Sequence, residues 1–210
     1  MSAIAIHTAR FYHLADLVRR RSGLWLNCDH AELITSRLAP VAARFGFREI
    51  AALLAELEDE PEELARAVTE AMATHETSFF RDPAVFEYVR SKVLPGLMRA
   101  RTAQRRLRIW CAAASTGQEA YSLAMLLDYA GLFESGWKVD LFASDFSRDA
   151  VVRIKEGGYS DYELARGLPL SMRDRYCVAS DSGRWHMVDG LRRRLRIHRF
   201  NLLDNFGWLG

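Results

Sequence analysis

The later part of the chain alternates short apolar stretches, typical of buried strands, with amphipathic stretches of helical periodicity. Strands that alternate with helices predict a parallel α/β sheet, and such sheets bind their ligands at the carboxyl ends of the strands. This alternation limits the fold more than any other feature of the sequence. The predicted segments are strands at 107–112, 138–143 and 194–198 and helices at 117–130 and 148–154.

Two further segments frame or interrupt this pattern. Asp82 and Pro83 predict a helix start, with the aspartate as N-cap and the proline at the first helical position. Pro95 and Gly96 are expected to end that helix. Residues 159–193 break the alternation of strands and helices, so we expect them to form a small inserted subdomain.

The first ~75 residues predict a helical bundle, because apolar residues recur at helical spacing in four stretches. Acidic residues outnumber basic ones in residues 1–72, and the reverse holds in the remainder. With 210 residues the chain is long enough for two such domains. The periodic residues are Phe11, Leu14, Leu17 and Val18, then Leu33, Ile34, Leu38 and Val41, then Ile50, Leu53, Leu54 and Leu57, and finally Leu64, Ala67, Val68 and Ala71.

Composition argues against several classes of protein. The residues are 50% hydrophobic and 27% charged, as in ordinary globular domains, and the net charge of +2 is too small to indicate nucleic-acid binding. Cys28, Cys111 and Cys177 have neither disulfide nor zinc spacing, so we expect a reducing cytoplasm and no metal. Because no apolar run approaches the roughly 18 residues of a transmembrane helix, we expect no membrane insertion.

The loop from Ala113 to Gly117 stands between a predicted strand and a predicted helix, and it is made of small and hydroxyl residues. Small side chains let a ligand approach the backbone, and the start of a helix favours a negative group. The dinucleotide fingerprint G-x-G-x-x-G is absent, which weakens a nicotinamide or flavin interpretation. The loop therefore indicates a ligand other than a dinucleotide.

Two carboxylates flank this loop. Asp145 ends the second predicted strand, where an acid commonly binds both hydroxyls of a ribose; alternatively it caps the helix that starts near Ser147. Glu119 is either a ligand contact or the last member of a capping box that begins at Thr116.

The stretch Thr74–Asp82, "THETSFFRD", is richer in hydroxyl, aromatic and basic residues than a linker requires. Phe79 and Phe80 could equally be core residues, and Arg81 could simply pair with an acid. The stretch is therefore a second candidate wall of a binding site.

In order along the chain, "THETSFFRD", "WCAAASTGQEAYS", "FASDFS" and "FNLLD" resemble the CheR-type chemotaxis receptor methyltransferases. These enzymes use S-adenosylmethionine to esterify glutamate side chains of chemoreceptors and release S-adenosylhomocysteine. The resemblance implies an all-helical domain over residues 1–75 and a Rossmann-like methyltransferase domain over 76–210. It also implies a small inserted β-subdomain at about 176–196.

By motif position, the resemblance implies a set of cofactor contacts, among which Arg81 would also orient the reacting carboxylate as the catalytic residue. The family usually has asparagine where His75 stands and an acid where Gln118 stands. The implied cofactor contacts are His75, Thr77, Arg81, Glu119, Asp145, Asn201 and Leu202.

The resemblance also implies a receptor-binding helix over residues 31–45, whose Arg37 and Arg44 would face an acidic region of the receptor. A solvated helix face is the alternative for these arginines. The inserted stretch looks short beside family members that dock a receptor's carboxyl-terminal pentapeptide, so we expect recognition independent of that pentapeptide.

The family continues with a strand "F-C-R-N-V-x-I-Y-F", whereas this sequence stops at Gly210. We therefore expect a truncated chain with an incomplete sheet, whose open edge could support self-association. Two alternatives follow: a non-catalytic signalling module that binds S-adenosylmethionine or S-adenosylhomocysteine, and a methyltransferase for another substrate.

Overall fold

The computed structural model describes residues 8–27, 29 and 31–209. Residues 1–7, Cys28 and Gly210, which the predicted domains and cysteine pattern include, lie outside the described residues. The chain divides into two compact units, Met1–Thr74 with Asn201–Gly210 and His75–Phe200, each with its own hydrophobic core.

The first unit is a helical bundle, as the periodicity predicts. Its apolar stripes meet in one buried cluster, in which Leu14, Leu38 and Leu53 are fully buried. Leu33, predicted as a core residue, is instead 47% exposed. The elements are α1 (Thr8–Ser22), α2 (Ala31–Arg44), α3 (Ile50–Glu56), a 3₁₀ turn (Leu57–Asp59), α4 (Glu62–Met72) and a second 3₁₀ turn (Phe206–Leu209).

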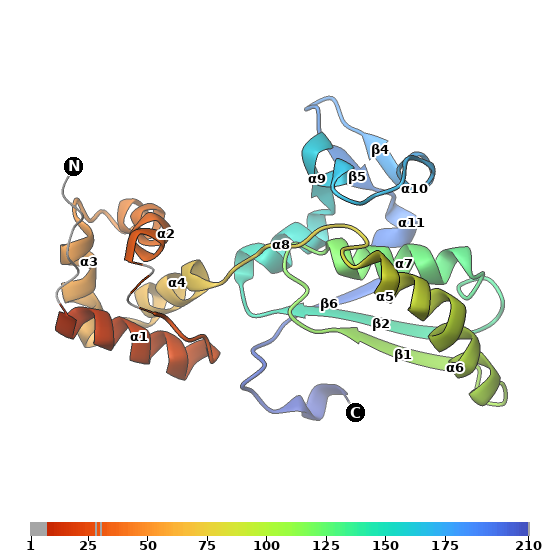
Figure 1. The fold of residues 1–210 in the computed structure, drawn as a ribbon, viewed down its shortest axis with the longest axis horizontal. Helices are drawn as coiled ribbons and strands as arrows, with labels where there is room; N and C mark the ends of the chain where they lie inside the picture. Colours follow the sequence, from red (N-terminus) through yellow and green to blue (C-terminus); the bar gives the residue numbers. More distant parts are fainter. Residues whose placement is uncertain (1–7, 28, 30, 210) are drawn as a thin grey trace. The chain divides into compact units, whose positions relative to one another are not determined.

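The second unit contains the predicted parallel sheet, with strand order β1-β2-β6 (Figure 1). The register pairs Cys111 with Ala143 and Asp145 with Arg199, so the carboxyl ends of the strands share one edge. The alternating elements are β1 (Arg106–Cys111), α7 (Gln118–Tyr129), β2 (Lys138–Asp145), α8 (Arg148–Glu156) and β6 (Leu195–Arg199).

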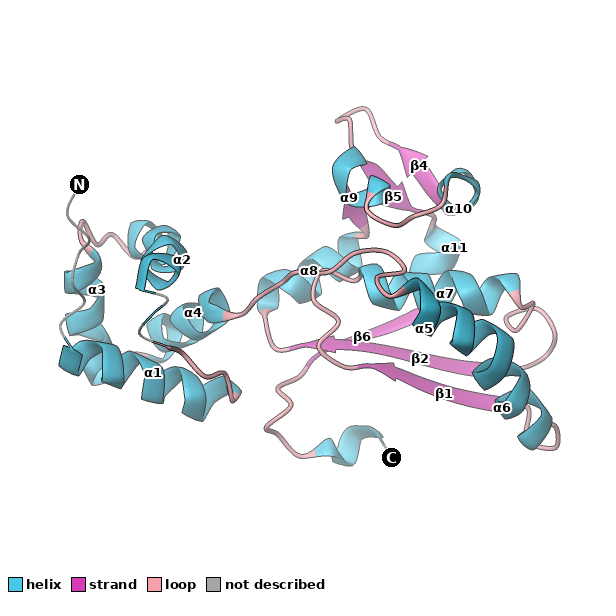
Figure 2. Ribbon diagram, viewed as in Figure 1, coloured by secondary structure: helices cyan, strands magenta, loops and turns pink. Residues whose placement is uncertain are grey.

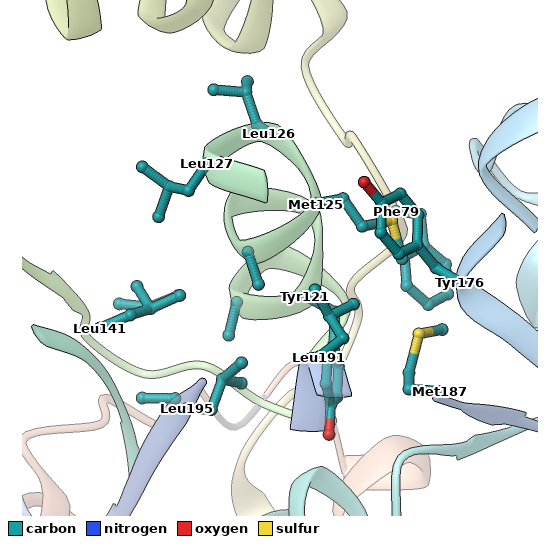
Figure 3. Close-up of a cluster of buried hydrophobic side chains, with 14 of the residues drawn as sticks. Phe79, Tyr121, Met125, Leu126, Leu127, Leu141, Tyr176, Met187, Leu191 and Leu195 are labelled. Atoms are coloured by element: carbon teal, nitrogen blue, oxygen red, sulfur yellow. The ribbon is translucent and has the colours of Figure 1, made fainter. Parts of the chain in front are cut away.

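Helices α7, α8 and α11 lie on one face of this sheet (Figure 2). The strands turn Leu107, Leu141 and Leu195 into the core between sheet and helices. Figure 3 shows Leu141 and Leu195 on the sheet side of this cluster, with Phe79 and Met125 further along it. Burying such side chains supplies roughly 1.5–3 kcal/mol each, so this core fixes the strand edge that carries the loops.

The helix predicted to start at Pro83 begins there, but its predicted end is wrong. Helix α5 (Pro83–Tyr88) passes through a π-helical segment (Val89–Val93) into α6 (Leu94–Ala100), so Pro95 and Gly96 lie inside a helix. Pro95 has no amide to donate in this continuous helix, and it follows directly on the π-helical segment, where the regular hydrogen-bond pattern changes.

The inserted subdomain contains a second, antiparallel sheet of strand order β3-β5-β4. The predicted range 176–196 starts too late, because β3 lies ahead of it, and ends too late, because Leu195 already belongs to β6. The elements are β3 (Gly158–Tyr159), α9 (Asp161–Ala165), α10 (Leu170–Tyr176), β4 (Cys177–Ala179), β5 (Trp185–Met187) and α11 (Asp189–Arg192).

Candidate functional site

The loop between β1 and α7 has a strained backbone. Ala113 and Ser115 both have a φ angle of 52°, and Gly117 has a φ of 98°. Each residue other than glycine pays roughly 1–3 kcal/mol in this region, and such strain persists only where the surroundings enforce it. The neighbouring strand therefore has to hold this loop in place.

The carboxyl end of strand β2 accepts hydrogen bonds from this loop. The Ala114 amide donates to the Ser144 carbonyl oxygen at 2.8 Å, and the Ser115 amide donates to Asp145 Oδ2 at 2.8 Å. The Gly117 amide closes the turn by donating to the Ala114 carbonyl oxygen at 2.9 Å. The backbone of the loop is thereby fixed against the end of β2.

Asp145 is 5% exposed and joins two loops. Besides accepting from Ser115, its Oδ1 accepts from the Ser147 amide at 3.0 Å. The alternative that Asp145 caps α8 is wrong, because Ser147 is the N-cap and its hydroxyl accepts from the Ala150 amide at 3.2 Å. Each carboxylate oxygen accepts from one of these amides and retains lone-pair capacity to accept from a ligand hydroxyl as well.

The capping box at the start of α7 does not form. The N-cap is Gly117, without a side-chain cap, and the Thr116 hydroxyl donates instead to Gln118 Oε1 at 2.7 Å. Glu119 is exposed, and its carboxylate accepts from the Cys111 thiol at 2.9 Å. Burial, followed by the hydrogen bond to Glu119, raises the pKa of Cys111, so its thiol remains a donor at neutral pH.

The stretch from Thr74 to Asp82 is anchored to α7 and to the core. Phe79 is fully buried and meets Tyr159 edge-to-face with ring centroids 5.0 Å apart, which confirms the core alternative for Phe79. The Phe80 amide donates to the Ser122 hydroxyl at 3.0 Å, and that hydroxyl donates to the Gln118 carbonyl oxygen at 2.7 Å. These contacts bring the two candidate walls to the same end of α7.

The remaining predicted residues of this stretch precede or follow those anchors. His75 is exposed and Thr77 is half-buried. The exposed Arg81 donates through Nη1 to the Glu76 carbonyl oxygen at 2.8 Å, which leaves other donors of its guanidinium for a ligand. Their contact with a cofactor stays a prediction.

Asn201 and Leu202 belong to the first unit, where the Asn201 amide donates to the Arg21 carbonyl oxygen at 2.6 Å. Leu202 is 45% exposed. Their predicted part in a cofactor site stays a prediction as well.

The two arginines predicted to bind the receptor differ in the contacts they make within the chain. Arg37 donates to the Met72 carbonyl oxygen at 2.5 Å and to the Thr74 hydroxyl at 3.0 Å, and so it ties α2 to the end of α4. Arg44 is exposed and lies over the Phe45 ring at 5.4 Å. Arg44 is therefore the better placed of the two to meet an acidic partner.

The donors and acceptors at the strand edge fit an adenosyl cofactor. The Ser115 hydroxyl is buried and has no hydrogen-bond partner among the described residues, as expected of a group that binds a ligand. Carboxylates suit ribose hydroxyls and an ammonium group, and the start of α7 suits a carboxylate.

Two other kinds of site receive no support from the described part of the chain. Residues 8–27, 29 and 31–209 contain no group of three or more His, Cys, Asp and Glu side chains that could hold a metal ion. Over the same residues, no helix has both the length and the apolar character needed to span a bilayer.

Comparison with known families decides the interpretation of this edge. Residues 75–209 match the family described as "CheR methyltransferase, SAM binding domain", and residues 9–71 match "CheR methyltransferase, all-alpha domain". The chain belongs to the CheR methyltransferase family. The two family domains correspond to the helical and Rossmann-like units except at residues 201–209, which the family model assigns to the S-adenosylmethionine-binding domain and which pack in the helical unit. The β1–α7 loop lies in the S-adenosylmethionine-binding domain.

Curated CheR relatives match along most of this chain. It is 34% identical to chemotaxis protein methyltransferase 1 of Pseudomonas aeruginosa over 92% of this chain and 71% of the relative. It is 33% identical to chemotaxis protein methyltransferase Cher2 of Pseudomonas putida, over 95% of this chain and 74% of the relative. A chemotaxis protein methyltransferase of Vibrio parahaemolyticus is 30% identical over 100% of this chain and 76% of its own length.

Sequence patterns missed two of the residues that build the site. Cys111 orients Glu119, and Ser122 fastens the Phe80 backbone to α7. The only sequence signal for either residue is its place in the stretch "WCAAASTGQEAYS".

Proposed function

We propose that this chain methylates glutamate side chains of chemoreceptors, forming methyl esters and leaving S-adenosylhomocysteine. The observation that carries the proposal is the strained loop 113–117, held by Asp145 at the carboxyl ends of the strands, in a chain of the CheR family. Relatives named chemotaxis protein methyltransferases support the chemotactic substrate.

Asp145 would bind the ribose hydroxyls, and Glu119 would pair with the ammonium group of the methionine part. The Ser115 hydroxyl and the first amides of α7 would bind the methionine carboxylate. When bound, the cofactor supplies a methyl group on a sulfonium, an electrophile that a carboxylate can attack directly.

The residues of this chain would then have to position the glutamate carboxylate of the substrate and exclude water from it. A glutamate carboxylate is already ionised at neutral pH, so the reaction requires no strong base. Arg81 would orient that carboxylate through the guanidinium donors that do not bind Glu76. Removing water from the carboxylate makes it a better nucleophile and lowers the barrier further.

Arg44 is our candidate for attracting the acidic methylation region of a receptor, since Arg37 is occupied with α4 and the segment after it. A charge at an exposed position acts chiefly on the rate of encounter. Recognition would then rest on the helical unit rather than on a terminal peptide of the receptor.

The proposal is tested by incubating receptor-containing membranes with radiolabelled S-adenosylmethionine and the chain, followed by alkaline release of labelled methanol from methyl esters. Asp145→Asn should bind S-adenosylhomocysteine at least about tenfold more weakly, because an amide cannot accept both backbone donors. The exposed Asp149→Asn on α8 is the matched control.

The outcomes separate the candidate functions. Alkali-labile label on receptor supports the proposal. Binding of S-adenosylhomocysteine without any transfer would instead identify a non-catalytic signalling module. Label on a small molecule or nucleic acid would identify a different methyltransferase.

A further inference from the structure

Tyr159 lies in the two-residue strand β3 of the small sheet and is fully buried. Its phenolic hydroxyl donates to the Thr116 carbonyl oxygen at 2.8 Å. Burial raises the pKa of Tyr159 well above its usual value, so the hydroxyl keeps its proton at neutral pH. A residue of the inserted subdomain thus reaches into the loop that the cofactor would contact.

Thr116 stands between the two positions of the loop that most need support, Ser115 with a φ of 52° and Gly117 with a φ of 98°. The hydrogen bonds to Ala114 and Ser115 come from β2. The bond from Tyr159 holds the next residue, Thr116, so the strained segment is hydrogen-bonded both to the parallel sheet and to the small sheet.

The ring of Tyr159 also supports the second wall of the site. It meets Phe79 edge-to-face at 5.0 Å, and Phe79 belongs to the stretch that carries Thr77 and Arg81. On its own sheet Tyr159 pairs with Trp185 of β5. One side chain therefore contacts both walls and is itself fixed by the small sheet.

We propose that Tyr159 is a positioning residue, whose hydroxyl holds the Thr116 carbonyl so that loop 113–117 is in its cofactor-binding conformation before the cofactor arrives. This inference rests on the proposed function for the identity of the cofactor, but not for the state of the loop. Losing the hydroxyl lets the loop relax, and binding must then restore the strained conformation at the expense of affinity.

Tyr121 provides a matched control. It is fully buried in the same cluster, with its ring 6.2 Å from that of Tyr159, and its hydroxyl donates to the Ile154 carbonyl oxygen at 2.7 Å. Tyr159→Phe and Tyr121→Phe each keep the ring and remove one buried hydroxyl–carbonyl bond. Only the first bond ends on the cofactor loop.

The first experiment measures amide hydrogen exchange in the full chain without cofactor. Tyr159→Phe should accelerate exchange at Ser115, whose amide donates to Asp145, and at Gly117, whose amide donates to the Ala114 carbonyl oxygen, by a larger factor than at Leu141 in β2. Tyr121→Phe should show no such excess at Ser115 and Gly117. Equal protection of the loop amides in Tyr159→Phe and wild type would overturn the inference.

The second experiment titrates both variants with S-adenosylhomocysteine. Tyr159→Phe should raise the Kd about fivefold, and Tyr121→Phe less than about twofold, while both lower the unfolding temperature alike. Equal weakening in the two variants would mean a general loss of stability and would overturn the inference. If the wild-type chain fails to bind, the proposed function falls, and the exchange experiment still decides the role of Tyr159.

Discussion

Gly117 has a φ angle of 98°, and a Cβ atom on it would lie 3.0 Å from the phenolic oxygen of Tyr159 and 3.1 Å from Ile154 Cγ1. The positive φ angle would strain any other residue even in open space. The short distances mean that the side chains of Tyr159 and Ile154 would also have to move. Glycine is therefore required at position 117 both by its backbone conformation and by packing.

Gly117→Ala should lower the free energy of unfolding by at least about 2 kcal/mol, from left-handed strain and crowding together. It should also weaken binding of S-adenosylhomocysteine, because the residue opens α7. Gly96→Ala is the control: no atom lies within 4 Å of its added Cβ, and alanine in α6 should stabilise by roughly 0.5 kcal/mol. Denaturant unfolding of the two variants makes the comparison, and similar stabilities would contradict the argument.

The residues that could be predicted are those whose chemistry shows in local pattern. Asp145 was predicted at a strand end, and the structure puts it there, against the loop. Its contact with a ribose stays a prediction. The capping prediction for Glu119 failed because α7 begins one residue later than predicted, with Gly117 rather than Thr116 as its N-cap. Tyr159 could not be predicted, because its partner is 43 residues away and only the folded small sheet brings them together.

At the scale of elements, Asp140 links the strands of the parallel sheet. Its carboxylate is 1% exposed, accepts a hydrogen bond from Arg106 on β1 at 2.8 Å and forms an ion pair with Arg196 on β6 at 2.8 Å. Burial alone would raise the pKa of Asp140. The hydrogen bond from Arg106 and the charges of Arg196, Arg106 and Lys138 outweigh burial and hold the pKa below its ordinary value of 3.8.

Asp140→Asn should lower the free energy of unfolding by about 1–2 kcal/mol near neutral pH, a range reduced for the solvent exposure of both arginines. Because the folded pKa is depressed, the stabilisation is complete above 3.8 and is lost as the pH falls through the folded pKa. The difference in the free energy of unfolding between wild type and Asp140→Asn should therefore become smaller as the pH falls below 3.8.

Urea unfolding across pH measures that difference. Asp189→Asn, which breaks a surface pair with Arg192, is the control and should change stability little. A difference for Asp140→Asn that stayed constant from neutral pH to well below 3.8 would contradict the assignment.

Long periodic elements could be predicted and short ones could not. The parallel strands follow the sequence pattern closely, with β2 running two residues further, to Asp145. Strand β3 has only two residues, too few to show any alternation, so the sheet it joins was bounded wrongly. Pro95 and Gly96 mislead because both are common where helices end, whereas here they lie in a continuous helix just after a π-helical segment.

At the scale of the molecule, the described residues form two hydrophobic clusters that share no residue. Leu38 on α2 and Leu141 on β2 are both fully buried, each in the cluster of its own unit. The opposite charge balance of the two parts of the sequence predicts this division. The segment Asn201–Gly210 was not predicted to join the helical unit, since the family resemblance assigned it to the methyltransferase domain.

Each core packs within its own unit. Leu38→Ala and Leu141→Ala should therefore each lower the free energy of unfolding by about 2–5 kcal/mol, and each should accelerate hydrogen exchange of amides in its own unit. Leu38→Ala should accelerate hydrogen exchange in α2 and α4, and Leu141→Ala in β1 and β2. Leu33→Ala is the control on the same helix; at 47% exposure it should change stability by less than about 0.5 kcal/mol. Equal acceleration of both units by either core substitution would show one cooperative core, and the two-unit description would then be wrong.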